Sequence, residues 1–242
     1  VTGAIHAQGH CQSCWVFAAL ATLDSRLCIA TDGNFSGAAA VLSRGFGTSC
    51  ASNHNGCRGG FEYWVYEYVD RAGGVPSTGC SPYFDDGASV EHFSKSVTAP
   101  PCPMACTGKG YPRALEEDFY QPKGVSRYSI VQRPTGSAVE QVKAAILGGG
   151  PIAFSMYCTS PFIGYTTGVY KICLPYHANH ALHTIGWGVE DGTKYFMGLN
   201  SWGTSWGDEG RVKVEECAPF DFTIPGDIDL SSTKFPTLLE SW

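Results

Sequence analysis

The chain has 242 residues, of which 43% are hydrophobic, enough to fill one large core or two small ones. Its formal net charge is −6, its pI is about 5.6, and it lacks the basic patch that nucleic-acid binding needs. No apolar run is long enough to cross a bilayer, so we expect a soluble chain that binds neither nucleic acid nor membrane.

The cysteine content indicates an oxidising compartment, because eleven cysteines are many for a cytosolic protein. The odd number leaves at least one thiol outside intramolecular disulfides, as a cysteine nucleophile requires. Asn34 begins an Asn-Phe-Ser glycosylation sequon, which is consistent with secretion. The chain starts at Val1 without an initiator methionine or a signal peptide, and we interpret it as a processed or truncated product.

The stretch from Gln8 to Phe17 leads into a mostly apolar segment, which predicts a buried central helix over residues 14–28. Ser13 is a good N-cap for this helix. Cys14 would lie in its first turn, where the helix dipole and unpaired N–H groups stabilise a thiolate. A cysteine at a helix start is more often a packed apolar residue or half of a disulfide, and Cys11-x-x-Cys14 alone also fits a redox pair or half of a zinc site.

The rest of the first half contains one further clear helix. Residues 33–55 are interpreted as loop with a short helix near residues 38–42. Apolar side chains recur at helical spacing over residues 61–72, which predicts an amphipathic helix. Residues 75–123 are rich in cysteine and proline, so they form either a disulfide-stapled excursion or a disordered linker, and the cysteines favour the excursion.

The second half is predicted to be one helix followed by strands. Ser137 to Glu140 is a capping box that opens the helix, and a Gly-Gly-Gly-Pro run ends it. Five strand-like runs follow, at residues 152–157, 168–173, 181–189, 194–200 and 211–215. Helices first and strands later predict an α+β fold with two lobes.

A cysteine nucleophile needs a base, a group that orients the base, and donors for the oxyanion. Of the seven histidines, only His180 and His183 lie at or within a predicted strand, and strand alternation puts them on opposite faces. Asn200 ends the next strand, where its side chain can accept a hydrogen bond from an imidazole, and Trp202 can cover that bond. His180, Asn200 and Trp202 are each ordinary residues when taken alone, but together with Cys14 they indicate hydrolytic chemistry.

Four blocks of the sequence resemble the papain-type cysteine proteases, and within them the cathepsin B group most of all. The blocks are Gln8-Gly9-x-Cys11-x-Ser13-Cys14-Trp15-x-Phe17, Gly56-Cys57-x-Gly59-Gly60, Asn179-His180-Ala181-Leu182 with Gly186-Trp187-Gly188, and Asn200-Ser201-Trp202-Gly203-x-x-Trp206-Gly207-x-x-Gly210. The resemblance implies a papain-like α+β fold with a helical lobe, a β-barrel-like lobe and a cleft between them. We expect the helical lobe at residues 8–122, with an insertion at about 75–122, and the β-rich lobe at 123–242 together with 1–7.

By this resemblance, Cys14 is the nucleophile, His180 the general base and acid, and Asn200 the residue that orients His180. Gln8 and the backbone N–H of Cys14 form the oxyanion hole. The resemblance also implies a set of substrate-binding residues, which are Gly59, Gly60, Gln12, Trp202, Phe220, Asp221 and His92.

Several of these residues carry expectations about substrates. Gly59 and Gly60 lack Cβ atoms, so an extended substrate backbone can lie close to them. Gln12 replaces a glycine that lines the pocket for the residue before the scissile bond. Phe220 holds the spacing of an acidic residue of cathepsin B and Asp221 follows it, so we expect bulky apolar side chains in the second pocket, with Arg tolerated only if Asp221 turns inward.

The resemblance also pairs most of the cysteines. The implied disulfides are Cys11–Cys57, Cys50–Cys102, Cys80–Cys106 and Cys173–Cys217. Cys14, Cys28 and Cys158 are left over, and the family partner of Cys28 lies upstream of the first residue of this chain.

The insertion resembles an occluding loop but is shorter, and His92 alone remains of two adjacent histidines that hold a substrate's C-terminal carboxylate. We therefore expect weak dipeptidyl carboxypeptidase activity. The resemblance implies a monomeric lysosomal, vacuolar or secreted endopeptidase that uses no metal or organic cofactor. Its expected partners are peptide or protein substrates, a pro-segment and cystatin-type inhibitors. Two alternatives are an inactive binding protein of the same fold and a thiol oxidoreductase that uses Cys11 and Cys14.

Overall fold

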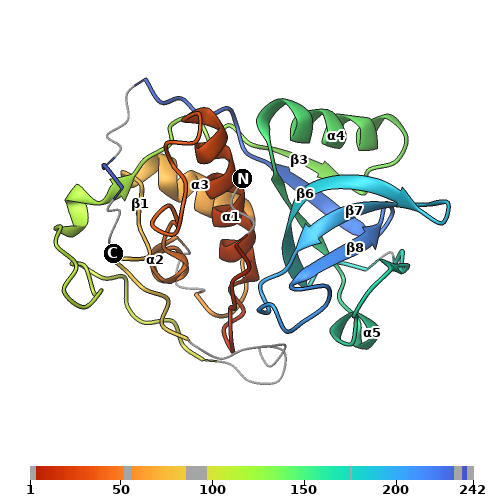
Figure 1. Ribbon diagram of the computed structural model, residues 1–242, viewed down its shortest axis with the longest axis horizontal. Helices are drawn as coiled ribbons and strands as arrows, with labels where there is room; N and C mark the ends of the chain where they lie inside the picture. Colours follow the sequence, from red (N-terminus) through yellow and green to blue (C-terminus); the bar gives the residue numbers. More distant parts are fainter. Residues whose placement is uncertain (1–3, 52–55, 86–96, 175, 232–235, 239–242) are drawn as a thin grey trace.

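The computed structural model describes residues 4–51, 56–85, 97–174, 176–231 and 236–238. Helices α1 (Cys14–Ala30), α2 (Arg44–Cys50) and α3 (Glu62–Arg71) gather in one half, and a seven-stranded sheet forms the other (Figure 1). Each half has its own hydrophobic core. The fold is therefore the two-lobed α+β arrangement that the sequence predicts.

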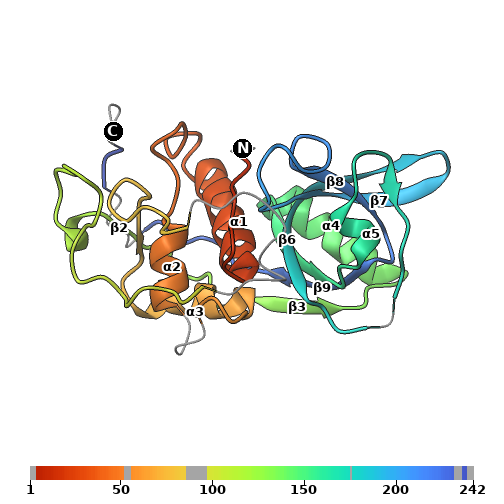
Figure 2. The ribbon, with the colours of Figure 1, turned by 90° about the horizontal axis from the view of Figure 1, so that it is seen from below.

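Helix α1 is the central element, as predicted, and it is two residues longer than expected. Nearly all of its residues are buried, because most of its side chains are apolar or small and the charge of the buried Asp24 is paired with Arg44 at 2.6 Å. It packs against α2 and α3 on one side and against the sheet on the other, next to β6 (His180–Glu190) in both views (Figures 1 and 2). Ser13 occupies the N-cap position, but its side chain makes no capping hydrogen bond, which corrects one expectation.

The large sheet carries the second half of the chain. Its strand order is β3-β9-β4-β6-β7-β8-β5, and the neighbours are antiparallel except for β5 and β8. Besides β6, the strands are β3 (Ser129–Gln132), β4 (Ile152–Met156), β5 (Val169–Tyr170), β7 (Thr193–Leu199), β8 (Arg211–Glu215) and β9 (Pro219–Ile224). Met156 pairs with His180, so the first residue of β6 lies beside the end of β4.

Smaller elements complete the two lobes. In the helical lobe, β1 (Val75–Pro76) pairs with β2 (Phe119–Tyr120), and η2 (Leu115–Glu117) precedes β2. Helices α4 (Ser137–Gly149) and α5 (Ser160–Ile163) lie with the sheet (Figure 2). Within the described residues, no helix combines the length and the apolar character needed to cross a membrane.

Two further predictions of local structure are wrong, and two strands were missed. The short helix near residues 38–42 is absent, and α2 starts later because the Ser43 hydroxyl accepts a hydrogen bond from the N–H of Phe46 at 2.9 Å. The capping box at Ser137 is absent because Gly136, with a φ of 54°, is the N-cap of α4. Strands β3 and β9 were not predicted at all, although β9 lies between β3 and β4.

The structure contains the four disulfides that the family resemblance implies. They are Cys11–Cys57, Cys50–Cys102, Cys80–Cys106 and Cys173–Cys217. Two of them staple the insertion, which is therefore an excursion tied to the helical lobe. Since Cys11 is bonded to Cys57, it cannot form a redox pair or a zinc site with Cys14. Cys14, Cys28 and Cys158 are not part of these four disulfides.

The chain passes between the lobes more than once. Val125 belongs to the helical core, and Ile228, Leu230 and Leu238 also pack against that core after the last strand. The end of the chain thus contributes to the packing of the helical lobe.

Candidate active site

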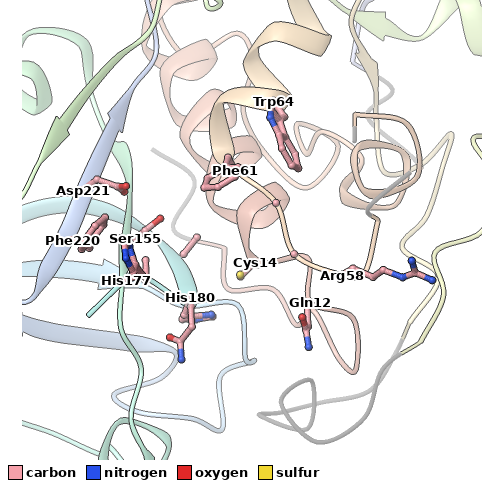
Figure 3. A pocket seen from close by; sticks show the side chains of 15 residues that line it. Gln12, Cys14, Arg58, Phe61, Trp64, Ser155, His177, His180, Phe220 and Asp221 are labelled. Atoms are coloured by element: carbon pink, nitrogen blue, oxygen red, sulfur yellow. The ribbon is translucent and has the colours of Figure 1, made fainter. Parts of the chain in front are cut away.

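A groove of about 710 Å³ lies where the two lobes meet. Cys14 lines it from the start of α1, while His180 and Asp221 line it from the sheet (Figure 3). The groove therefore brings together a free thiol and an imidazole from opposite lobes.

Cys14 is 8% exposed. Burial, the largest influence, raises the pKa of its thiol to about 12, and the negative charge of Glu62 acts in the same direction. The backbone N–H groups of Ala181, Trp15 and Cys14 lower this pKa but do not offset the burial. The helix terminus alone therefore does not produce the thiolate that we expected, and ionisation requires a base in the groove.

His180 is oriented by Asn200, whose Oδ1 lies 2.7 Å from the imidazole Nε2. The same Oδ1 accepts a hydrogen bond from the backbone N–H of Ser201 at 2.8 Å, so the oxygen and not the nitrogen of the amide faces the ring. Nε2 of His180 must then be the donor. Nδ1 is consequently the basic nitrogen of the neutral ring.

Trp202 packs on His180, with ring centroids 4.7 Å apart and an angle of 34° between the rings. Trp202 is fully buried and does not line the groove. It therefore covers the His180–Asn200 pair as a shield against water, which is the placement expected from the sequence, and it does not face a substrate.

His183 lies on the other side of β6, as strand alternation predicts. Its Nδ1 is 3.1 Å from the hydroxyl of Thr22 on α1, inside the interface between the lobes. Burial and then the charges of Arg44 and Arg26 lower the pKa of His183 to about 3, so the ring is neutral. It has a packing role between the lobes.

Gln8 is fully buried and held at both ends of its amide. Nε2 donates to the carbonyl of Cys11 at 2.8 Å, and Oε1 accepts from the Ser201 hydroxyl at 2.6 Å. Its backbone N–H donates to the carbonyl of Ser201 at 2.8 Å. Gln8 lies beneath the groove surface rather than on it, and Ser201 links it to Asn200.

The wall of the groove next to Cys14 is formed by the segment after Cys57. Gly59 has a φ of 84°, a backbone conformation that favours glycine, and a Cβ atom there would meet nothing within 4 Å. A Cβ at Gly60 would lie 2.7 Å from the ring of Trp15. Gln12 and Arg58 line the same wall and are joined by a β-bridge.

Two carboxyl groups come together on the opposite side of Cys14. Glu62, at the start of α3, is 2% exposed and accepts a hydrogen bond from the Ser155 hydroxyl of β4 at 2.8 Å. Burial, followed by the charge of Asp221, raises the pKa of Glu62 to about 7. Burial also raises the pKa of Asp221, whose Oδ1 is buried and makes no hydrogen bond to the described residues.

The structure thus brings most of the predicted site residues to one groove and adds others. Phe220 lines it beside Asp221 on β9, whereas His92 lies outside the described residues. Glu62, Ser155 and Arg58 were not predicted from the sequence to lie at this site. Ser155 could have been found from the alternation of its predicted strand, but the helical pattern gave Glu62 no reason to be buried.

The described residues contain one group of three side chains spaced like metal ligands, formed by Cys173, Glu215 and Cys217. Its two sulfurs are joined in a disulfide, and only a thiolate is a strong ligand. This group therefore does not constitute a metal site.

The fold and the groove define a thiol protease architecture, and comparison with known proteins agrees. The papain family of cysteine proteases matches residues 1–219, so this chain belongs to that family. A gut-specific cysteine proteinase of Caenorhabditis elegans is 34% identical in an alignment 220 residues long, which covers 87% of this chain and 63% of that protein. Cathepsin B-like cysteine proteinase 5 of the same organism is 31% identical over 94% of this chain and 70% of its own length.

Solved structures show the same fold at lower identity. The proform of the ragweed pollen cysteine protease Amb a 11 has a TM-score of 0.69 at 22% identity, covering 91% of this chain and 60% of the proform. Procathepsin B S9 from Trypanosoma congolense has a TM-score of 0.71 at 23% identity, and the match covers 93% of this chain and 72% of the procathepsin. The chain thus spans less than two thirds of the length of the gut-specific proteinase and less than two thirds of the length of the pollen proform.

Proposed function

We propose that this chain is a cathepsin B-like cysteine endopeptidase, in which Cys14 is the nucleophile and His180 the general base and acid. The observation that carries the proposal is a free thiol at the start of α1 facing the same groove as an imidazole held by Asn200. The buried thiol needs a proton acceptor to ionise, and Nδ1 of His180 is the nitrogen available for that role.

The reaction follows from these protonation states. Nδ1 takes the thiol proton, and the sulfur attacks the carbonyl carbon of the scissile peptide bond. Collapse of the tetrahedral intermediate breaks the C–N bond, and the imidazolium gives its proton to the leaving amine. A water molecule then attacks the thioester while His180 takes one of its protons, and the released acid leaves the thiol restored.

Gln8 is proposed as a donor to the oxyanion. Its amide nitrogen carries two hydrogens, and the carbonyl of Cys11 accepts one of them. The contact from Ser201 fixes which end of the amide is nitrogen, so the second hydrogen has a defined direction. The backbone N–H of Cys14 is the proposed second donor.

The substrate is proposed to lie along Gly59 and Gly60, with its second side chain before the cut placed against Phe220 and Asp221. We propose that this pocket prefers bulky apolar side chains and also tolerates Arg, and the presence of Asp221 among the residues lining the groove supports the second part. Internal cleavage is proposed to dominate over removal of C-terminal dipeptides, because the insertion retains a single candidate for the carboxylate contact, His92.

We further propose lysosomal, vacuolar or secreted localisation, a pro-segment and inhibition by cystatin-type proteins for a monomeric enzyme. Support for a pro-segment comes from the two similar structures, both of which are proforms. Four disulfides support an oxidising compartment.

Labelling of the full chain with an irreversible epoxide inhibitor, followed by peptide mass mapping, tests the proposed function. We expect modification at Cys14 together with loss of hydrolysis of a fluorogenic peptide. Cys14→Ala should abolish both, whereas Cys28→Ala, which removes the cysteine near the other end of α1, should keep both. Peptide binding without hydrolysis or labelling would instead support an inactive binding protein.

A further inference from the structure

Tyr83, in the insertion, contacts the turn that precedes α1. Its hydroxyl donates a hydrogen bond to the carbonyl of Gln8 at 2.8 Å and lies 2.8 Å from the hydroxyl of Ser13. Its ring packs edge-on against Phe17, with centroids 4.9 Å apart. Tyr83 thus contacts the segments on both sides of the turn between Gln8 and Cys14.

The protons in this contact can be assigned. Burial raises the pKa of Tyr83 well above its usual range, so the phenol keeps its single hydrogen. The carbonyl of Gln8 is only an acceptor, and it takes that hydrogen. The 2.8 Å contact between the hydroxyls of Tyr83 and Ser13 can therefore be a hydrogen bond only if the Ser13 hydroxyl donates to the oxygen of Tyr83.

The contact with Tyr83 holds the Ser13 hydroxyl on the Tyr83 side of the turn, and this hydroxyl makes no capping hydrogen bond to α1. An N-cap serine normally accepts a hydrogen bond from the second or third N–H of its helix. The third, that of Val16, already donates to the carbonyl of Ser13 at 2.8 Å, so the N–H of Trp15 is the one that the hydroxyl would take. Instead the N–H groups of Trp15 and Cys14 interact with the sulfur of Cys14.

Asp85 holds the same turn from its other side. Its carboxylate accepts a hydrogen bond from the backbone N–H of His10 at 2.7 Å. The same carboxylate lies 3.3 Å from Nδ1 of the His10 imidazole ring. Gly9 has a φ of 59°, and a Cβ atom there would lie 2.7 Å from the carboxyl carbon of Asp85. The insertion is therefore fitted closely to the turn, and Tyr83 has little freedom to withdraw.

We propose that Tyr83 is a positioning residue that keeps the Ser13 hydroxyl away from the first turn of α1. This reserves the N–H groups of Trp15 and Cys14 for the reacting sulfur and for the oxyanion. The inference rests on the proposed function, because it assigns a role beside the proposed nucleophile.

The first test is Tyr83→Phe in the full chain, which keeps the ring contact with Phe17 and removes one oxygen. The Ser13 hydroxyl is then free to cap α1 and to compete for the N–H of Trp15. We expect the rate of Cys14 alkylation by iodoacetamide at pH 6 to fall about tenfold, the size expected for one lost hydrogen bond to a charged group. The alkylation profile should shift to higher pH, and kcat should fall with little change in KM.

The second test is the double variant Tyr83→Phe with Ser13→Ala. With no serine oxygen to compete, we expect it to recover most of the alkylation rate that Tyr83→Phe loses. A general loss of packing would not be repaired by removing a second side chain. Tyr165→Phe is the matched control, because its hydroxyl also donates to a backbone carbonyl, that of Gly168 at 2.6 Å, away from the groove.

The outcomes separate the two proposals. If the unaltered chain hydrolyses peptides and Tyr83→Phe alkylates at an unchanged rate, the positioning role is wrong. An equally slow double variant would also overturn it. If the unaltered chain hydrolyses no peptide, the proposed function fails, but alkylation still measures the effect of Tyr83 on the thiol.

A third variant covers the case in which Tyr83→Phe does not fold. Ser13→Asp puts a carboxylate at the N-cap position of α1. An ionised carboxylate has no hydrogen to donate to Tyr83, and Asp is a strong N-cap. We expect it to slow alkylation at least as much as Tyr83→Phe. A rate equal to that of the unaltered chain would contradict the proposal.

Discussion

Glu62→Gln should remove a pH-dependent loss of stability. The carboxyl group of Glu62 is buried, and its pKa rises from 4.5 to about 7 through burial and the charge of Asp221. At about 1.4 kcal/mol per pKa unit, this rise corresponds to about 3 kcal/mol of unfolding free energy.

The sign of the effect follows from which state binds the proton more tightly. The folded chain holds the Glu62 proton up to about pH 7, whereas the unfolded chain releases it near pH 4.5. The contribution to stability is therefore complete below pH 4.5 and is lost as the pH rises through 7. Gln cannot ionise, and its amide oxygen can still accept the hydrogen bond from Ser155.

Urea unfolding between pH 4.5 and 8 measures this difference. The unaltered chain should lose about 3 kcal/mol more unfolding free energy over this range than Glu62→Gln does. Glu140→Gln, which alters a 70% exposed carboxylate, is the control and should parallel the unaltered chain. Parallel curves for Glu62→Gln would show that the carboxyl is already ionised at low pH, and the reasoning about its burial would be wrong.

Two further predictions concern substrates. Burial raises the pKa of Asp221, and only ionised Asp221 attracts Arg, so the ratio of kcat/KM for Arg against Leu at the second position before the cut should rise with pH. Asp221→Asn should lower this ratio about tenfold at pH 8. A ratio that does not change with pH or with the variant would remove Asp221 from the pocket. A peptide with a free C-terminal carboxylate should be cleaved no faster than its amide, and a strong preference for the acid, measured as kcat/KM, would contradict the weak carboxypeptidase activity.

The sequence predicts the elements that carry strong local patterns. Most side chains of helix α1 are apolar or small, so its burial and central position follow from its residues, although Asp24 and Arg26 are buried with them. Because side chains alternate along a strand, the three-residue spacing of His180 and His183 is enough to put them on opposite faces of β6. The disulfide pairs followed from the family resemblance and not from the spacing of cysteines, which alone leaves many connectivities open.

Other features depend on contacts between distant segments and leave no local signal. Glu62 looks like an exposed first-turn residue of an amphipathic helix, and its burial comes from β4 and β9 of the other lobe. Ser13 has the sequence of an N-cap, but Tyr83, seventy residues later, takes its hydroxyl. The pKa of Cys14 could not be read from its helix position, because burial between the lobes dominates it.

The approach of Cys14 to the sheet depends on small side chains. Ala18 of α1, Ala153 of β4 and Ala181 of β6 are buried together with Cys14 in a small cluster between the lobes. Because none of them extends beyond Cβ, the helix can lie close enough to the strands for the N–H of Ala181 to reach the sulfur. A larger residue at position 153 or 181 would push the helix away, since well-packed interfaces do not absorb added volume without strain. The proximity of thiol and imidazole therefore depends on these alanines as well as on the two reactive residues.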